Sequence, residues 1–216
     1  MAKKTFLIIF LRISAIPIIL LANIINLLNI KSFKDDIEKS LKIIDDFSNI
    51  KIDKRFIQVL ILAEDRRNKL HRGVDTIAIL RAIKVRLLEN KYQGASTIEQ
   101  QFIRVVTNRF EKTFYRKLRE QILAILLDKK AEKYDISKSY LLIAYYGYNL
   151  TGLSAIKKIC IDINKVDITT AIEIISRLKY PQPKNINNIW LSKKNKRVLY
   201  IKKIIEKINY KDKLYV

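Results

Sequence analysis

Glu64 and Asp65 are the first residues of this 216-residue chain whose types and position could do acid–base chemistry. They directly follow the apolar run 59–63, so they are expected at the edge of a buried helix. Low dielectric at such an edge favours proton uptake by a carboxylate, which suits a general base. His71, the only histidine, follows one short segment later. An ordinary helix end, with salt bridges to Arg66 and Arg67, explains the same residues equally well.

A second polar cluster runs from residue 94 to residue 104 and reads GASTIEQQFIR. Hydroxyl groups at the start of a helix, beside its free N–H groups, form an end that binds anions. Adjacent glutamines one turn later can hydrogen-bond sugar or phosphate oxygens. Without other information, a capped helix with solvated glutamines is the simpler interpretation. The candidate ligand-binding residues here are Ser96, Thr97, Gln100, Gln101 and Arg104.

The third cluster is cationic around one acid: Lys112, Arg116 and Lys117 precede Glu120. Spacings of four and three place Arg116 and Lys117 next to Glu120 on a helix. A surface ion pair is the structural interpretation. A carboxylate embedded in cations that hold a diphosphate is the functional one.

The three clusters together resemble the signatures of the peptidoglycan glycosyltransferase (transglycosylase) family. Residues 64–75, EDRRNKLHRGVD, are similar to the pattern E-D-x-x-F-x-x-H-x-G-x-D. The second cluster is similar to G-x-S-T-I-x-Q-Q-x-x-K. Residues 116–120, RKLRE, with Ala124, resemble R-K-x-x-E-x-x-x-A. The motifs occur in the family's order, and the resemblance covers roughly residues 50–200.

The resemblance implies a mainly α, lysozyme-like glycosyltransferase domain of the monofunctional biosynthetic type. Glu64 is then the general base for the acceptor sugar's hydroxyl. Glu120 then assists departure of the lipid diphosphate, and the resemblance implies a nearby divalent cation (Mg or Mn) as cofactor, with Glu120 as its ligand. The implied substrates are a lipid-linked disaccharide diphosphate and a growing glycan chain, and the implied protein partners are other cell-envelope synthesis proteins. The implied substrate-binding residues are Asp65, His71, Ser96, Thr97, Gln100, Gln101, Arg104, Lys112, Arg116 and Lys117.

Several positions depart from the family patterns. Asn68 replaces the aromatic residue of the first motif, and Arg104 stands where the second has lysine. In the fourth motif Tyr140 occupies the place of a glutamate, and residues 145–147 read YYG where the family has YLN. These changes favour a non-catalytic relative that binds the lipid-linked precursor or envelope partners, whereas the retained Glu64 and Glu120 favour an enzyme.

The elements that must position these residues are expected to be helices, because sustained period-two alternation is absent from the sequence. We expect helices over 56–64, 76–90, 96–106, 113–133, 137–148, 169–180 and 193–208, with any sheet small. Ser32 and Asp35 are expected to form a capping box for a helix through Phe47, as are Ser96 and Glu99 for theirs. A stripe of apolar residues is expected to face inward on the second helix: Ile77, Leu80, Ile83 and Leu87.

The first 30 residues are expected to anchor the chain in a membrane. Residues 6–30 are almost wholly apolar, long enough to span a bilayer of roughly 30 Å, and follow Lys3 and Lys4. Positive charge before the span predicts an extracytoplasmic domain over 31–216, carried by a single pass through the cytoplasmic (inner) membrane. An interfacial helix or a hydrophobic core helix is the alternative.

Composition argues against several other classes of function. The net charge of +22 attracts polyanions, but no nucleic-acid-binding module is recognisable, so no nucleic acid is expected as a partner. One cysteine excludes an intramolecular disulfide framework and a cysteine-rich metal site. A lysozyme-like glycan hydrolase stays open as a further alternative, although it does not need cations around its second carboxylate.

Overall fold

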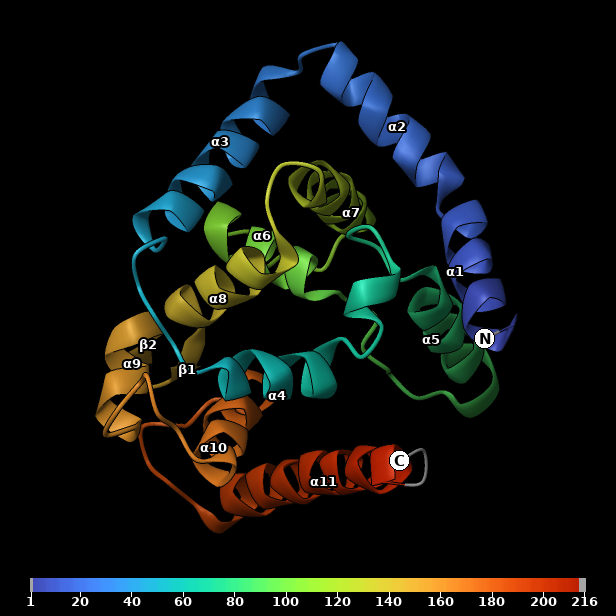
Figure 1. The fold of residues 1–216 in the computed structure, drawn as a ribbon. Helices are drawn as coiled ribbons and strands as arrows, with labels where there is room; N and C mark the ends of the chain where they lie inside the picture. Colours follow the sequence, from blue (N-terminus) through green and yellow to red (C-terminus); the bar gives the residue numbers. More distant parts are fainter. Residues whose placement is uncertain (1, 214–216) are drawn as a thin grey trace. The chain divides into compact units, whose positions relative to one another are not determined.

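The computed structural model describes the backbone of residues 2–213 and the side chains of residues 5–208 (Figure 1). About 70% of the chain is helical, which confirms the expected mainly α class. The described elements are α1 (Ala2–Ser14), α2 (Ile16–Leu27), α3 (Lys31–Asp46), α4 (Lys54–Glu64), η1 (Asn68–Leu70), α5 (Thr76–Glu89), α6 (Ile98–Thr107), α7 (Phe114–Asp128), α8 (Lys133–Ile143), β1 (Tyr145–Gly147), β2 (Leu150–Thr151), α9 (Gly152–Ile159), α10 (Ile168–Lys179) and α11 (Asn188–Lys213). They form two compact units, one of residues 1–48 and 65–140, the other of 49–64 and 141–216.

Helix α7 is the centre of the first unit. Residues 122–127 are all buried, because α2, α3 and α6 pack around this helix. From α6, Phe102 and Ile103 are fully buried. Arg119 of α7 ties α3 to this core: its guanidinium donates to Asp36 Oδ2 at 2.6 Å and lies over the Phe33 ring at 4.0 Å.

Gly73 lets the first-motif loop approach α7 closely. Its φ is +76°, and a Cβ added there would lie 2.5 Å from the carbonyl oxygen of Ala124. The Gly73 carbonyl in turn accepts from Thr97 Oγ1 at 2.7 Å and from Gln100 Nε2 at 3.2 Å. A single glycine therefore joins the first motif to the start of α6 and the middle of α7.

The second unit is built on α4, α10 and α11. Phe56, Val59 and Leu60 of α4 are fully buried, and this helix packs on both α10 and α11. β1 and β2 form one antiparallel pair, and Gly147 bridges to Gln182. On α11 the residues Lys193, Lys196, Lys203 and Lys207 are exposed, so its basic side chains largely face solvent.

The apolar N-terminus is a bent helix pair. In the part of the chain that is described, no single helix has the length and hydropathy of a membrane span, and Thr5–Ser14 with Ile16–Leu27 reach them only as a pair bent by 51°. Leu11, Ala15 and Ala22 are buried against the first unit, where α1 packs on α5 and α2 on α7. The segment 6–30, expected to span a membrane, is made of two helices, with Pro17 in the first turn of the second. The side chains of Lys3 and Lys4 lie outside the described residues.

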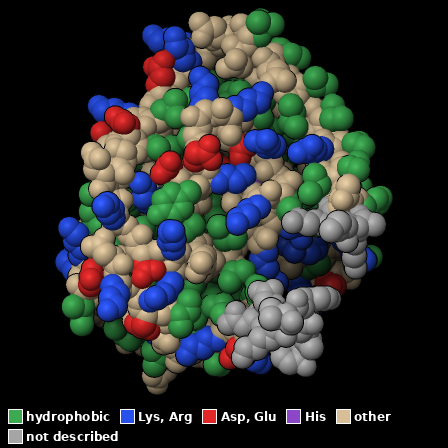
Figure 2. Space-filling model, in the orientation of Figure 1, with side chains coloured by type: hydrophobic (Ala, Val, Ile, Leu, Met, Phe, Trp, Pro, Cys, Tyr) green, Lys and Arg blue, Asp and Glu red, His purple; other side chains and the backbone are tan. Residues whose placement is uncertain are grey.

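The outer faces of these helices are apolar (Figure 2). Phe6 is 70% exposed and Leu27 84% exposed. Helix α5 continues the pattern, because Leu80, Ile83 and Leu87 are exposed and Ala78 is its buried residue. The inward stripe expected on this helix was wrong: periodicity identified a shared apolar face, but that face points away from the protein core.

Several helix ends also differ from expectation. Asp75 caps α5, and its Oδ1 accepts from the Ala78 N–H at 2.8 Å. The cap of α6, however, is Thr97 and not Ser96, and α3 has no side-chain cap at its start, so both expected capping boxes were wrong. The helix expected over 113–133 ends at Asp128, and the helix expected over 137–148 begins at Lys133 and ends at Ile143. The helix expected to begin at Thr169 or Thr170 is capped by Asp167.

Replacing Gly73 with alanine should destabilise the first unit. The added Cβ would overlap the Ala124 carbonyl, and a left-handed φ costs a residue with a Cβ roughly 1–2 kcal/mol before any clash. Overpacking adds roughly 1–3 kcal/mol. Thermal unfolding should therefore show a clearly lower melting temperature for Gly73→Ala. Gly94→Ala is the matched control, because a Cβ there meets nothing within 4 Å. Equal melting temperatures for the two variants would contradict the packing described.

Candidate functional site

Glu120 of α7 is a buried carboxylate surrounded by cations. Arg104, from α6, holds it with two hydrogen bonds, Nε to Oε1 at 2.7 Å and Nη2 to Oε2 at 3.1 Å. Arg116 Nη1 also donates to Oε1, from one turn earlier on α7. Lys117 Nζ lies 3.8 Å from Oε2. The structure thus brings Arg104, Arg116 and Lys117 together on one acid; we call these four residues the cation cluster.

Ser96 and Gln100 extend the cation cluster along the start of α6. Ser96 Oγ accepts from Arg104 Nη2 at 3.2 Å and from Lys117 Nζ at 3.0 Å. Lys117 Nζ also donates to Gln100 Oε1. The second motif therefore contributes in two ways. Ser96 and Gln100 contact the cations, whereas Thr97 caps α6 and bonds Gly73.

The cation cluster carries excess positive charge. Three cations share one carboxylate, and their side chains are partly exposed while that of Glu120 is 3% exposed. Burial, reinforced by the neighbouring charges of Arg104 and Arg116, lowers the pKa of Lys117 to about 8, against the opposing pull of Glu120. Desolvation works against the charge of Arg104, but its contact with Glu120 outweighs this and raises the Arg104 pKa. An anion placed here would meet fixed cations that need no rearrangement.

A divalent cation does not fit Glu120 by itself. Both oxygens of this carboxylate already accept hydrogen bonds from guanidinium groups, and three positive charges surround it. A metal ion would have to be held largely by oxygens of a bound diphosphate.

Asp65 and His71 belong to a separate buried network. His71 Nε2 lies 3.0 Å from Asp65 Oδ1, and Asp65 Oδ2 accepts from the Ile98 N–H at 3.3 Å. Burial alone would raise the Asp65 pKa, but these hydrogen bonds and the charge of His71 lower it. At 5% and 4% exposed, the two residues join the first-motif loop to α6 and do not face solvent.

Glu99 completes this network and was not singled out as functional by the sequence. It is 1% exposed and accepts from Asn68 Nδ2 at 3.3 Å and from Lys133. Among the described residues, Asp65, His71 and Glu99 form a group close enough to share a metal ion. The Lys133 ammonium already supplies positive charge to Glu99, so we interpret the group as structural. The polar Asn68, at the position of the family's aromatic residue, suits this polar network.

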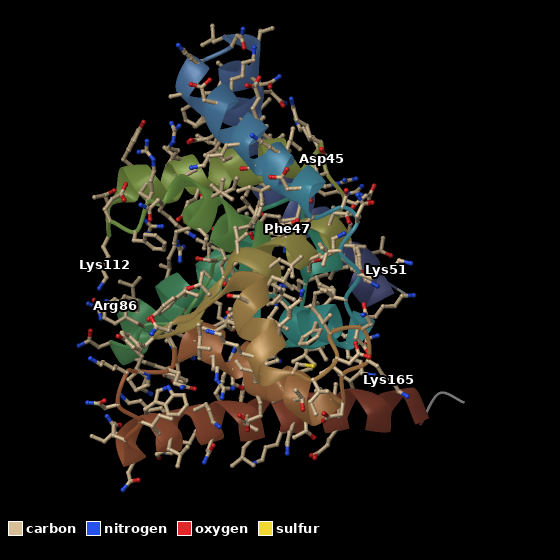
Figure 3. All side chains as sticks on the ribbon, turned by 90° about the vertical axis from the view of Figure 1, so that its left-hand side faces the viewer. Asp45, Phe47, Lys51, Arg86, Lys112 and Lys165 are labelled. Carbon is tan, nitrogen blue, oxygen red and sulfur yellow. The ribbon has the colours of Figure 1, made fainter. Side chains whose placement is uncertain are left out.

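The last two candidate site residues are Gln101 and Lys112. Gln101 accepts from Tyr140 Oη at 2.7 Å. Lys112 is exposed on the loop before α7, where its side chain points outward (Figure 3). The structure therefore does not place Lys112 with the other three cations.

Glu64 is the last residue of α4, in the second unit. Its Oε1 accepts from Arg197 Nη2 of α11 at 2.6 Å, and the same nitrogen donates to the Ala63 carbonyl at 2.7 Å. The Glu64 side chain is 17% exposed and that of Arg197 is 9% exposed. Sequence reasoning missed Arg197, because it lies outside every motif recognised; its position among the apolar residues of α11 is the only signal.

Comparison with known proteins identifies the family. The model of the Transglycosylase family matches residues 37–204, which include all three motifs. Penicillin-binding protein 1A of Escherichia coli is 38% identical over 105 residues, covering 48% of this chain and 12% of that protein. Penicillin-binding protein 1F of Bacillus subtilis is 34% identical over 105 residues, covering 48% and 15%.

A shorter relative matches over more of its length. The biosynthetic peptidoglycan transglycosylase of Nitrosospira multiformis is 29% identical over 147 residues, covering 66% of this chain and 64% of that protein. The chain spans only a small part of the two penicillin-binding proteins and just under two thirds of this one. With the family model matching more than half of its residues, the chain belongs to the transglycosylase family of peptidoglycan glycosyltransferases.

Proposed function

We propose that this protein is a glycosyltransferase that transfers or polymerises lipid-diphosphate-linked disaccharide units in peptidoglycan synthesis. The observation that carries the proposal is the cation cluster: one buried Glu120 with Arg104, Arg116 and Lys117 on it. Family membership supports glycosyl transfer as the reaction class.

The cation cluster is proposed to hold the donor's diphosphate. As the bond between the sugar C1 and the phosphate oxygen breaks, the electron pair stays on the diphosphate. Fixed cations stabilise this developing charge best when they are already in place. Glu120 holds two guanidinium groups in place through hydrogen bonds, and Ser96 and Gln100 orient the Lys117 ammonium.

Glu64 is proposed to act on the acceptor. Its carboxylate would take the proton of the acceptor sugar's 4-hydroxyl as the oxygen attacks C1 of the donor, so that one displacement inverts the anomeric carbon. The Glu64 side chain is 17% exposed, which leaves it partly accessible. A divalent cation, if used, would be bound mainly by the diphosphate, next to Glu120.

The membrane is proposed as the place of action. Apolar outer faces on α1, α2 and α5 support contact with lipid, where a lipid-linked donor resides. We propose attachment to the cytoplasmic membrane through residues 6–30, with the domain outside, where other envelope-synthesis proteins would be its partners. The bent helix pair supports attachment by length and composition.

A non-catalytic relative that binds the precursor is the second candidate. Tyr140 favours it, because a tyrosine bonded to Gln101 occupies the place of the fourth-motif glutamate. The intact cation cluster would serve either function, so glycan formation by the unaltered protein separates them.

Glu64→Gln should lower the rate of glycan formation by about 10²–10⁴-fold, the usual contribution of a general base. The amide keeps the shape of the side chain but cannot take up the proton. Donor binding and melting temperature, measured on the same preparation, should stay near wild type. A wild-type rate for this variant would remove Glu64 from the chemistry.

Arg116→Ala should weaken binding of a lipid diphosphate by about one to two orders of magnitude, because a charge-assisted hydrogen bond contributes roughly 1.5–3 kcal/mol. The control is Lys203→Ala/Lys207→Ala, which removes two exposed lysines of α11. Binding is measured in detergent at low and moderate salt. If both variants lose the same affinity and salt abolishes both losses, the cation cluster is merely a solvated basic face.

Donor binding should also fall as pH rises through about 8. Lys117 is protonated below its lowered pKa of about 8 and loses its charge above it, whereas a bound diphosphate would retain that proton. Affinity should therefore decrease by up to about 100-fold between pH 7 and pH 10, because the free protein must take up a proton whose cost rises about tenfold per pH unit above the lowered pKa. Lys117→Arg, which keeps its charge throughout, should flatten the profile. The same pH dependence in this variant would show that another group is responsible.

A further inference from the structure

Arg197 of α11 contacts the end of α4 with a single nitrogen. Its Nη2 donates to Glu64 Oε1 at 2.6 Å and to the Ala63 carbonyl at 2.7 Å, across 133 positions of sequence from Glu64. The last carbonyl groups of a helix lack partners within it and carry partial negative charge. A carboxylate at the same end adds to that charge. One guanidinium therefore contacts both the Glu64 carboxylate and one of these terminal carbonyls.

The Arg197 side chain is itself held in place. It is 9% exposed, and its guanidinium lies 5.3 Å from the ring centroid of Tyr200, one turn later. Val198 and Ile201, one and four residues later on α11, are buried. A guanidinium fixed by packing loses little further freedom when it binds a carboxylate, so it can define the position of that carboxylate.

Lys194 offers an internal comparison on the same helix. It lies three residues before Arg197, is also largely buried, and binds Glu173 Oε2 of α10 at 2.7 Å. Both cations fasten α11 to a neighbouring helix of the second unit. Only Arg197 does so through the residue to which we assign the proton transfer.

We propose that Arg197 is a positioning residue for Glu64, an inference that rests on the proposed function above. Arg197 fixes Oε1 and thereby sets the direction of the carboxylate. An ionised carboxylate has about four acceptor sites on two oxygens, so the bond at Oε1 does not prevent it from taking the acceptor's proton. Loss of Arg197 removes this bond and lets the carboxylate shift, and misplacement by about 1 Å can cost on the order of 100-fold in rate.

The test compares Arg197→Ala with Lys194→Ala in the full-length protein purified in detergent, using a lipid-linked disaccharide as substrate. Arg197→Ala should lower kcat by about 10- to 100-fold with little change in the donor KM. Arg197→Lys should recover part of this loss, and ethylguanidinium added to the alanine variant should do the same. Lys194→Ala should lose a similar amount of thermal stability but keep kcat near wild type.

Equal kcat values for Arg197→Ala and Lys194→Ala would overturn the proposal, since Arg197 would then only fasten α11. If Arg197→Ala does not fold, Arg197→Gln takes its place: it keeps a donor for Ala63 but loses the charge, and a wild-type kcat would overturn the proposal in the same way. The Glu64→Gln variant, measured in parallel, distinguishes a failure of the proposed function from a failure of the role of Arg197. A wild-type rate there refutes the proposed function itself, whereas an inactive Glu64→Gln with a fully active Arg197→Ala refutes only the role of Arg197.

Discussion

The candidate site depends on one imbalance of charge: the carboxylate of Glu120 is buried and shared by more cations than it can neutralise. Removing a carboxylate from water is costly unless it is paired and hydrogen-bonded, and Arg104 and Arg116 supply that compensation. The same contacts prevent three like charges from separating. The excess charge that remains is available to an anion, which makes this acid the organiser of a cationic site.

Other contacts within the first unit hold these charged side chains in place. Gly73 lets the first-motif loop touch α7, and its carbonyl receives Thr97 and Gln100 at the start of α6. The buried pair of Asp65 and His71 ties the same loop to the Ile98 N–H. The motif residues thus have two roles. Some carry the charge, and others fix the positions of α6 and α7, the helices that bear the charged side chains.

The sequence alone predicted those contacts that follow from the spacing of residues along one helix. Spacings of three and four placed Arg116 and Lys117 beside Glu120, and both lie there. Contacts between distant segments, such as that of Arg197 with Glu64, could not be predicted, because no local sequence pattern encodes them. Two neighbouring hydroxyls, Ser96 and Thr97, could each cap α6, so the cap was assigned one residue early. On α5, periodicity gave the apolar face but not what that face meets, and its residues, including Leu87, are exposed.

The retained cation cluster and Glu64 support catalysis, whereas Tyr140 in the fourth motif supports binding alone. The most direct measurement incubates the detergent-purified protein with a labelled lipid-linked disaccharide and a divalent cation, and then sizes the products. Glycosyl transfer through a diphosphate leaving group predicts glycan chains longer than the starting disaccharide, formed with release of the lipid diphosphate. Donor that stays unchanged, or that yields only free disaccharide by hydrolysis, would contradict this account.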